Sequence, residues 1–317
     1  MQEIQVSVVC NAYNHEAYIR DALEGFVKQK TSFAYEVLIH DDASTDKTAD
    51  IIREYEKIYP ELIKPIYETE NQYSKQDGSL ERIQYGRVKG KYIAICEGDD
   101  YWTDPLKLQK QYDCLEAHPT ADICATSAMT ESNGMISGEV SPSNKDVIFS
   151  VEEVIAGGGE FVATASLMCR AEIRKNPYPF LQMMPLDYFM QIAGALRGGM
   201  LFLSEPMCVY RVATPGSWTV SMQKSIEAQN DHKERVNRSL QCLDKDTNGK
   251  YHDVINQTIK EQNFQGFIRN YDFDSALLPE YRQWYMRLPV FKRVMIRLGK
   301  ICPQLVCTFW NFHRKVK

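Results

Sequence analysis

The first half of the chain alternates short apolar runs with segments whose apolar residues recur every three or four positions. Residues 4–10 form an apolar, β-branched run typical of a buried strand, and residues 16–29 repeat apolar side chains at helical spacing. The same alternation predicts strands at 35–40, 62–67, 92–96 and 121–128, with helices at 46–59, 79–89 and 105–117. Strands and helices that alternate in this way predict right-handed crossovers and an α/β fold, with a mostly parallel sheet flanked by helices.

The pattern changes after this alternation ends. Residues 130–160 are rich in Ser, Asn, Gly and Pro, which predicts a loop or an irregular hairpin. Regularity returns at 161–170 and is followed by a predicted helix at 186–197 and apolar strands at 200–204 and 207–212. Beyond about residue 216 the composition is helical and charged. We therefore expect a sheet domain over residues 1–215 and a helical region over 216–317.

Composition and charge narrow the classes of protein that this chain can belong to. A hydrophobic content of 44% in 317 residues is enough to bury a core, and a net charge of −5 argues against a nucleic-acid-binding surface over the whole molecule. The nine cysteines are odd in number and contain no C-x-x-C pair, which predicts reduced thiols and a cytoplasmic protein. The first residues, MQEIQVSVV, lack a signal-peptide pattern, and no apolar run is long enough to cross a bilayer.

Carboxylates follow two of the predicted strands. Asp41 and Asp42 come after the second strand, in LIHDDASTDKT, while Glu97, Asp99 and Asp100 come after the fourth, in ICEGDD. Ligands collect at the carboxyl ends of strands in such sheets, and crowded carboxylates repel one another unless a cation compensates. Oxygen donors without nearby His or Cys favour Mg²⁺ or Mn²⁺. An ordinary surface turn remains the alternative, and neither G-x-G-x-x-G nor a P-loop motif is present.

Three segments, taken together, resemble a known family. They are VSVVCNAYNHEAYIRDAL near the start, YEVLIHDDASTDKTADII about thirty residues later, and KGKYIAICEGDDYWTDPLKLQKQ. Their order and spacing resemble the inverting, GT-A-fold family 2 glycosyltransferases of bacterial polysaccharide synthesis. The resemblance covers residues 4–128, extends less clearly to about 213, and says little about 220–317.

The resemblance implies what the domains do. Residues 1–128 would hold a nucleotide-sugar donor, which we expect to be UDP-linked, and residues 129–215 would receive the acceptor. The acceptor would be a glycan or a lipid-linked oligosaccharide in cell-surface, capsular or O-antigen synthesis. Two alternatives stay open: transfer onto a polyprenyl phosphate, and a catalytically inactive GT-A-like scaffold that only binds.

The resemblance also assigns residues to the donor. Asn11, Ala12, Tyr13 and Asn14, a single loop after the first strand, would line the nucleotide. Asp42 would accept a hydrogen bond from the base. Asp99 would lie near the ribose or the sugar.

The remaining assignments concern the chemistry. By resemblance, Asp100 would bind Mn²⁺ or Mg²⁺ directly, while the share of Glu97 in binding is open because the family more usually has Asp there. Asp187 would be the general base that takes the acceptor proton; its alternative is a carboxylate stabilised at a helix N-terminus. The metal would act as a Lewis acid on the leaving diphosphate.

The chain departs from the family pattern in two places. It lacks the A-R-N segment, so Arg82 and Arg87 are the candidates for contacts to the diphosphate, with solvated helix residues as the alternative. Ala213 stands where relatives often have a His.

The C-terminal segment 288–317 contains seven Lys and Arg residues and no acidic residue. At helical spacing its apolar face would consist of Leu288, Phe291, Val294, Met295, Leu298 and Ile301, with Ile296 as an exception. A basic amphipathic element of this kind predicts peripheral contact with an anionic cytoplasmic leaflet. A helix that packs on the catalytic domain and exposes a solvated basic face is the alternative.

Overall fold

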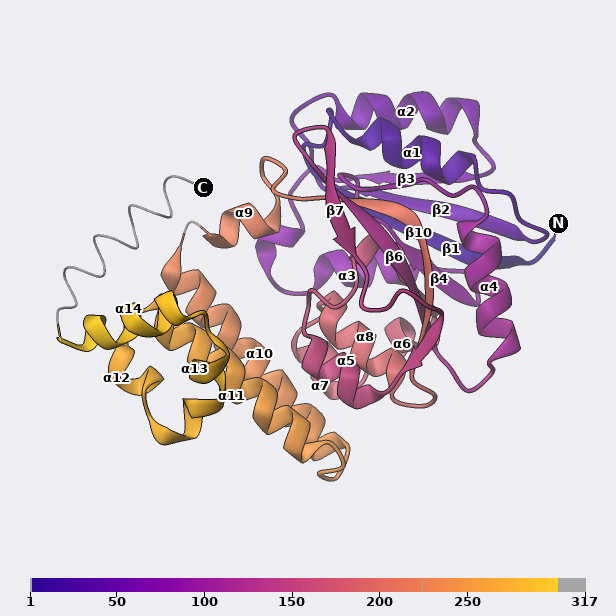
Figure 1. Cartoon of the computed structure of the whole chain (residues 1–317). Helices are drawn as coiled ribbons and strands as arrows, with labels where there is room; N and C mark the ends of the chain where they lie inside the picture. The colour runs from indigo at the N-terminus through magenta and orange to yellow at the C-terminus, as the bar shows by residue number, and fades with distance from the viewer. Residues whose placement is uncertain (1, 224, 302–317) are drawn as a thin grey trace. The chain divides into compact units, whose positions relative to one another are not determined.

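The computed structural model describes residues 2–223 and 225–301, and the chain divides into two compact units, Met1–Ser221 and Met222–Lys317 (Figure 1). The first unit is an α/β domain, whereas the described part of the second is helical. Each unit has an apolar core of its own. The expected α/β class, with a helical C-terminal region, is therefore confirmed. The division falls a few residues beyond the boundary at 215–216 that the sequence suggested.

The sheet of the first unit has the strand order β3-β2-β1-β4-β9-β6-β10-β5, with β7 beside β6 and β8 beside β10. Its strands are β1 (Ile4–Ala12), β2 (Ala34–Asp41), β3 (Ile63–Tyr67), β4 (Tyr92–Ile95), β5 (Tyr101–Trp102), β6 (Ile123–Ser132), β7 (Met135–Val140), β8 (Val147–Phe149), β9 (Met168–Arg170) and β10 (Met200–Arg211). Strands β3, β2, β1 and β4 are mutually parallel, as are β6 and β10. Strand β9 joins these two parallel groups by running antiparallel to both β4 and β6.

Helices cover both faces of this sheet (Figure 1). They are α1 (Ile19–Val27), α2 (Thr48–Ile58), α3 (Ser79–Gly86), α4 (Lys107–Ala117), α5 (Val151–Gly157), α6 (Glu172–Lys175), α7 (Pro179–Met183) and α8 (Asp187–Ala195). Helix α9 (Trp218–Gln223) spans the division between the two units. Helix α1 packs beside α2, whereas α5, α6 and α7 pack against α8. Because helices lie on both faces, β1 buries consecutive residues from Val6 to Cys10 instead of alternating ones.

The structure resolves two ambiguities of the sequence. Within residues 130–160 the hairpin alternative is correct, because β6 and β7 are joined by Asn133 and Gly134, whose φ angles of 52° and 75° suit a tight hairpin turn. The prediction of two strands, at 200–204 and 207–212, is wrong. These residues form one strand, β10, whose register with β6 shifts on both sides of Pro206. Proline lacks the N–H that a regular ladder needs, so a bulge accommodates it.

The second unit consists of helices α10 (Ile226–Asp246), α11 (His252–Arg269), α12 (Phe273–Ala276), α13 (Arg282–Arg287) and α14 (Val290–Ile301), with a 3₁₀ turn at Pro279–Tyr281. Its core is largely aromatic and contains Phe264, Phe273, Tyr281, Trp284, Tyr285 and Ile296. Among the described residues, no helix is both long and apolar enough to cross a membrane. Of the predicted C-terminal segment, residues 302–317 lie outside the described residues.

Candidate active site

Strands β1, β2 and β4 end at the same edge of the sheet and bring three loops together. The backbone N–H of Asp42 donates to the carbonyl of Ala12 at 2.9 Å, and that of Gly98 donates to the carbonyl of Asn11 at 2.9 Å. A Cβ at Gly98 would lie 2.8 Å from Nδ1 of His15 and 3.1 Å from Cβ of Ala12. The loop after β4 can therefore approach the loop after β1 this closely only because residue 98 has no side chain.

The acidic motif after β4 is largely withdrawn from water. Asp100 is buried, while Glu97 and Asp99 are half-buried. Burial, followed by the negative charge of Asp99, raises the pKa of Glu97 to about 8 and also raises the pKa of Asp100 well above its usual range. A bound cation would favour the charged forms of Glu97 and Asp100 and would therefore lower the pKa values of both carboxyl groups.

Arg211, the last residue of β10, organises the acidic motif. Its backbone N–H donates to Oδ1 of Asp100 at 2.8 Å, and its guanidinium Nη1 donates to the carbonyl of Asp99 at 3.0 Å. The same guanidinium donates through Nε to Glu131 at 2.9 Å and through Nη2 to Asp21. Arg211 is only 8% exposed, and the bonds of its guanidinium are partly buried and charge-assisted.

The loop that follows β10 also reaches the motif. Thr214 donates its hydroxyl to Oδ2 of Asp99 at 2.8 Å. The preceding residue, Ala213, adopts a left-handed conformation with φ of 60°, which is uncommon for a residue with a side chain. The position where relatives often have a His is therefore a turn that directs Thr214 toward Asp99. Sequence reasoning assigned no role to Arg211 or Thr214; the only signal was a Tyr-Arg pair ahead of a Gly- and Pro-containing loop.

Asp187 is the first residue of α8 and lies in the same electrostatic neighbourhood. It is half-buried, and its Oδ2 accepts a hydrogen bond from the hydroxyl of Thr164. Burial raises the pKa of Asp187, and its negative charge is in turn one of the causes that raise the pKa of Glu97. The structure thus brings the predicted base and the acidic motif within electrostatic reach of each other.

Asp42 has partners that the sequence did not indicate. Its buried carboxylate accepts hydrogen bonds from the backbone N–H groups of Gln72 at 2.6 Å and Tyr73 at 3.0 Å. It therefore holds the loop after β3 in place. An ionised carboxylate offers about four acceptor positions, so these two bonds leave capacity for the predicted contact with a base.

The loop predicted to line the nucleotide is ordered by its polar residues. Asn14, at φ of 55°, accepts a hydrogen bond from the backbone N–H of Thr45 at 2.8 Å, which ties the loops after β1 and β2 together. Ala12 is buried, whereas Tyr13 is 45% exposed at the edge of the site. Oδ1 of Asn11 is buried without a hydrogen-bond partner, and its Nδ2 lies 3.5 Å from Glu97. Asn11 therefore has an acceptor that the described protein groups do not use.

The two arginines proposed for the diphosphate have other partners. The guanidinium of Arg87 donates to the carbonyls of Ile39 and Lys64, so it ties β2 to β3. Arg82 is exposed and donates to the carbonyl of Asp77 at 2.6 Å. No hydrogen bond in the described part of the chain joins either arginine to the acidic motif, so their contact with a diphosphate stays a prediction.

The donor set fits a hard divalent cation. Among residues 2–223 and 225–301, no group of three or more His, Cys, Asp or Glu side chains is arranged to hold a metal ion alone. Mg²⁺ and related ions, however, are commonly held by one or two carboxylates together with substrate phosphates. The carboxylate of Asp100 is a group of this kind, because burial raises its pKa and a bound cation would favour its charged form.

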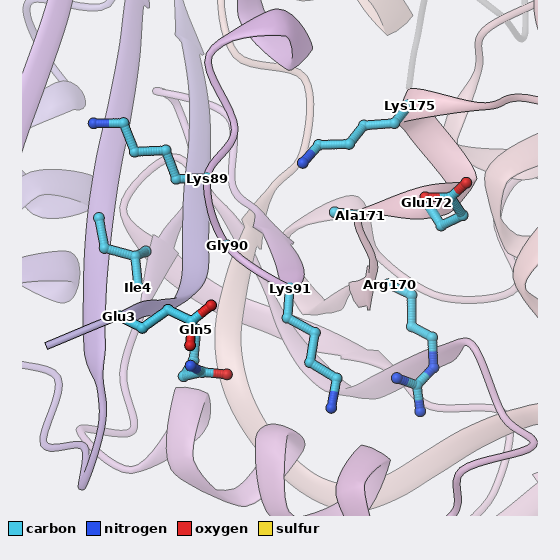
Figure 2. A pocket seen from close by; sticks show the side chains of 10 residues that line it. All are labelled: Glu3, Ile4, Gln5, Lys89, Gly90, Lys91, Arg170, Ala171, Glu172 and Lys175. Carbon is cyan, nitrogen blue, oxygen red and sulfur yellow. The ribbon is translucent and has the colours of Figure 1, made fainter.

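A separate cavity of about 500 Å³ lies at the opposite edge of the sheet, where β1 and β4 begin (Figure 2). Lys89, Lys91, Lys175 and Arg170 line it. Lys91 is paired with a carboxylate, as is Arg170, so much of this positive charge is already balanced. The cavity contains none of the residues at the carboxyl ends of the strands and is not part of the candidate site.

Comparisons with known proteins agree with this geometry. Residues 7–148 match the family model described as glycosyl transferase family 2. An uncharacterized protein of Mycobacterium tuberculosis is 38% identical over 214 residues, which cover 67% of this chain and 60% of that protein. The putative teichuronic acid biosynthesis glycosyltransferase TuaG of Bacillus subtilis is 38% identical over 112 residues, covering 35% of this chain and 41% of TuaG.

A solved structure shares the fold. Staphylococcus aureus TarS, crystallised with UDP-GlcNAc, superposes with a TM-score of 0.63 at 19% identity, covering 89% of this chain and 79% of that one. At this identity the likeness establishes the GT-A fold alone. The chain spans only 60% of the length of its mycobacterial relative. The matched segment, residues 7–148, belongs to glycosyl transferase family 2.

Proposed function

We propose that this protein is an inverting, metal-dependent glycosyltransferase that moves a sugar from a UDP-linked donor to a glycan acceptor in cell-surface polysaccharide synthesis. Family membership supports sugar transfer. The name of TuaG and that of the poly(ribitol-phosphate) beta-glucosyltransferase of Bacillus spizizenii, 33% identical over 99 residues, support a cell-wall or capsular glycan. The complex of TarS with UDP-GlcNAc supports a UDP-linked donor.

The observation that carries the proposal is the buried acidic motif at the carboxyl end of β4, held by Arg211 and facing the loops after β1 and β2. In the proposal, Asn11, Ala12, Tyr13 and Asn14 line the nucleotide. Asp42 accepts a hydrogen bond from the base, and Asp99 lies near the ribose or sugar. An apo protein gains no stability from such crowded carboxylates, which favours a binding role for them.

Asp100 would hold Mn²⁺ or Mg²⁺, and the share of Glu97 stays open. When bound, the ion supplies Lewis-acid stabilisation of the charge that develops on the leaving nucleoside diphosphate. The bond from the backbone of Arg211 fixes the orientation of the Asp100 carboxylate before any ligand arrives. This preorganisation lowers the cost of binding.

Asp187 is proposed as the general base. It would accept the proton of the acceptor hydroxyl while that oxygen attacks the anomeric carbon, and one-step displacement would invert the anomeric configuration. Burial raises its pKa, so the carboxylate is a stronger base than an exposed Asp. The hydroxyl of Thr164 would orient it by donating to Oδ2.

The proposed location is the cytoplasm, at the inner face of the membrane, where a lipid-linked acceptor would be exposed. The test is a screen of UDP-, GDP- and TDP-sugars for Mn²⁺-dependent hydrolysis and binding by the full chain. Hydrolysis of a UDP-sugar, lost when EDTA removes the metal, is expected. If no donor is bound or hydrolysed, the proposal is wrong and the inactive scaffold becomes the better interpretation.

A further inference from the structure

Helix α14 packs against the aromatic core of the second unit through the side of the helix that carries Ile296 and Gly299. Ile296 is fully buried, and a Cβ at Gly299 would lie 2.1 Å from the ring of Phe273. Gly299 therefore lets the helix backbone approach the aromatic core closely. Ile296, the exception to the predicted apolar face, is packed together with Met295 of that face, whereas Val294, Leu298 and Ile301 of the same face are exposed.

The opposite side of α14 carries a stripe of exposed apolar side chains. Val290, Val294, Leu298 and Ile301 follow each other at intervals of four, four and three residues, which places them on one face. They are 66%, 48%, 48% and 78% exposed, respectively. Contiguous exposed apolar side chains on one helix face mark interaction surfaces. We call these four residues the α14 stripe.

Helix α14 carries exposed basic side chains. Of Lys292, Arg297 and Lys300, Arg297 lies beside the α14 stripe because it is four residues before Ile301, whereas Lys292 and Lys300 lie toward the packed face. All 42 Asp and Glu residues of the chain lie before residue 281, whereas nine of its 37 Lys and Arg residues lie in 281–317. Lys300 is paired with Asp274 at 2.9 Å, but no carboxylate lies on α14 itself. Helix α14 is therefore cationic within an acidic protein.

We propose that α14 docks on an anionic lipid bilayer, with the α14 stripe inserted at the boundary between headgroups and acyl chains and Arg297 on the lipid phosphates. An apolar stripe on a helix whose charged residues are all basic is the pattern of a helix that lies in the membrane interface. A second copy of the chain is a poorer occupant, because two cationic surfaces would repel each other. The inference does not depend on the proposed sugar transfer, since it uses none of the site residues.

The experiment is co-sedimentation of the full chain with vesicles of phosphatidylcholine, alone or with about 30% phosphatidylglycerol, an anionic content sufficient to attract basic segments. Binding only to the anionic vesicles is expected. The double variant Val294→Ser/Leu298→Ser should weaken this binding about tenfold or more, because two side chains lose their apolar contact with the bilayer. Arg297→Gln should weaken it about fivefold, since a charge near an anionic surface contributes about 1 kcal/mol.

Matched controls come from exposed positions elsewhere. Ile136→Ser removes an apolar side chain that is 53% exposed on β7, and Lys145→Gln removes an exposed charge; both should bind vesicles as the unchanged protein does. All the substituted side chains are exposed or nearly so, and circular dichroism checks that each variant folds. Equal binding to neutral and anionic vesicles, or unchanged binding by the Val294/Leu298 variant, would overturn the proposal. So would a dimer, measured by light scattering, that the same variant dissociates while vesicle binding is absent.

Discussion

Arg211 and Asp100, 111 residues apart in the chain, are joined by a hydrogen bond of 2.8 Å from the backbone N–H of the arginine to Oδ1 of the aspartate. The bond connects the end of β10 to the turn after β4. Because the guanidinium of Arg211 also holds the carbonyl of Asp99, one residue fixes both the side chain and the backbone of the acidic motif. Arg211 is therefore a positioning residue for the proposed donor site.

Replacing Arg211 with Lys should impair both stability and donor binding. Lysine keeps the charge but cannot reach Asp99, Glu131 and Asp21 together, so partly buried acceptors lose their donors. We expect a loss of about 2–4 kcal/mol in the free energy of unfolding and weaker UDP binding. Urea unfolding and nucleotide titration measure the two effects.

The control for this variant is Arg20→Lys, in which the arginine pairs with Glu54 at the exposed surface. Exposed pairs contribute only about 0.2–1 kcal/mol, and the two side chains of this pair are 51% and 56% exposed. Equal behaviour of the Arg211→Lys and Arg20→Lys proteins in both assays would show that Arg211 does not position the site.

The raised pKa of Glu97, about 8, predicts that the protein without metal loses stability as the pH rises. Between its unfolded value and about 8, Glu97 binds more protons in the folded state, so the free energy of unfolding falls with increasing pH. Glu97→Gln removes this titration, and its stability should depend less on pH between about 6.5 and 8. Urea unfolding of both proteins across this window is the measurement. Parallel curves for the two proteins would contradict the assignment of the titration to Glu97.

Asp100→Asn tests the proposed metal ligand with little change of shape. The amide oxygen can still accept the hydrogen bond from the backbone of Arg211, so the fold should be kept. The loss of a carboxylate ligand should weaken Mn²⁺-dependent binding of UDP by about tenfold or more, as should Asp100→Ala. Isothermal titration with and without Mn²⁺ separates the metal-dependent part of the affinity.

The control for these variants is Asp104→Asn. It changes a carboxylate in the next turn, which is paired with Lys110 at 2.7 Å, and the variant should bind UDP normally. Metal-dependent affinity retained in both Asp100 variants would refute the role of Asp100 as ligand.

Much of the donor half of the fold could be predicted from local patterns. Strands β1, β2 and β4 are strong apolar runs, and the carboxylates that follow them lie at one edge because parallel strands share an orientation. The antiparallel strand β9 and the continuity of β10 past Pro206 could not be predicted, because both depend on pairing with β6, which is distant in the sequence.

In the candidate site, too, contacts between segments distant in the sequence could not be predicted. Its carboxylates are visible as a motif, but the partners of Arg211 come from α1, from β6 and from the turn after β4. No spacing rule connects these segments. On α14 the periodicity correctly indicated an amphipathic helix, but only the position of Phe273 determines which face is packed.

Asp187→Asn tests the proposed base. The variant keeps an acceptor for Thr164 but cannot take a proton, so the rate of transfer to a hydroxyl acceptor should fall by about 10²–10⁴-fold while UDP binding is kept. Steady-state transfer assays measure the rate, and nucleotide titration measures UDP binding. Asp46→Asn is the control, because Asp46 also lies at a helix start, where its Oδ1 accepts from the backbone of Thr48 at 2.9 Å. Transfer that survives in Asp187→Asn would instead favour a polyprenyl phosphate acceptor, which needs little help from a base.

Gly98→Ala tests whether the loops after β1 and β4 must be in close contact. The added Cβ would lie 2.8 Å from Nδ1 of His15 and 3.1 Å from Cβ of Ala12, so one of the two loops must move. We expect a loss of about 1–3 kcal/mol in the free energy of unfolding, together with weaker UDP binding. The matched control is Gly86→Ala at the end of α3, where the structure places no atom within 4 Å of the added Cβ. That variant should be neutral or slightly more stable, because alanine loses less backbone entropy on folding than glycine. If urea unfolding and nucleotide titration give the same results for both variants, the loops after β1 and β4 are not held against each other as described.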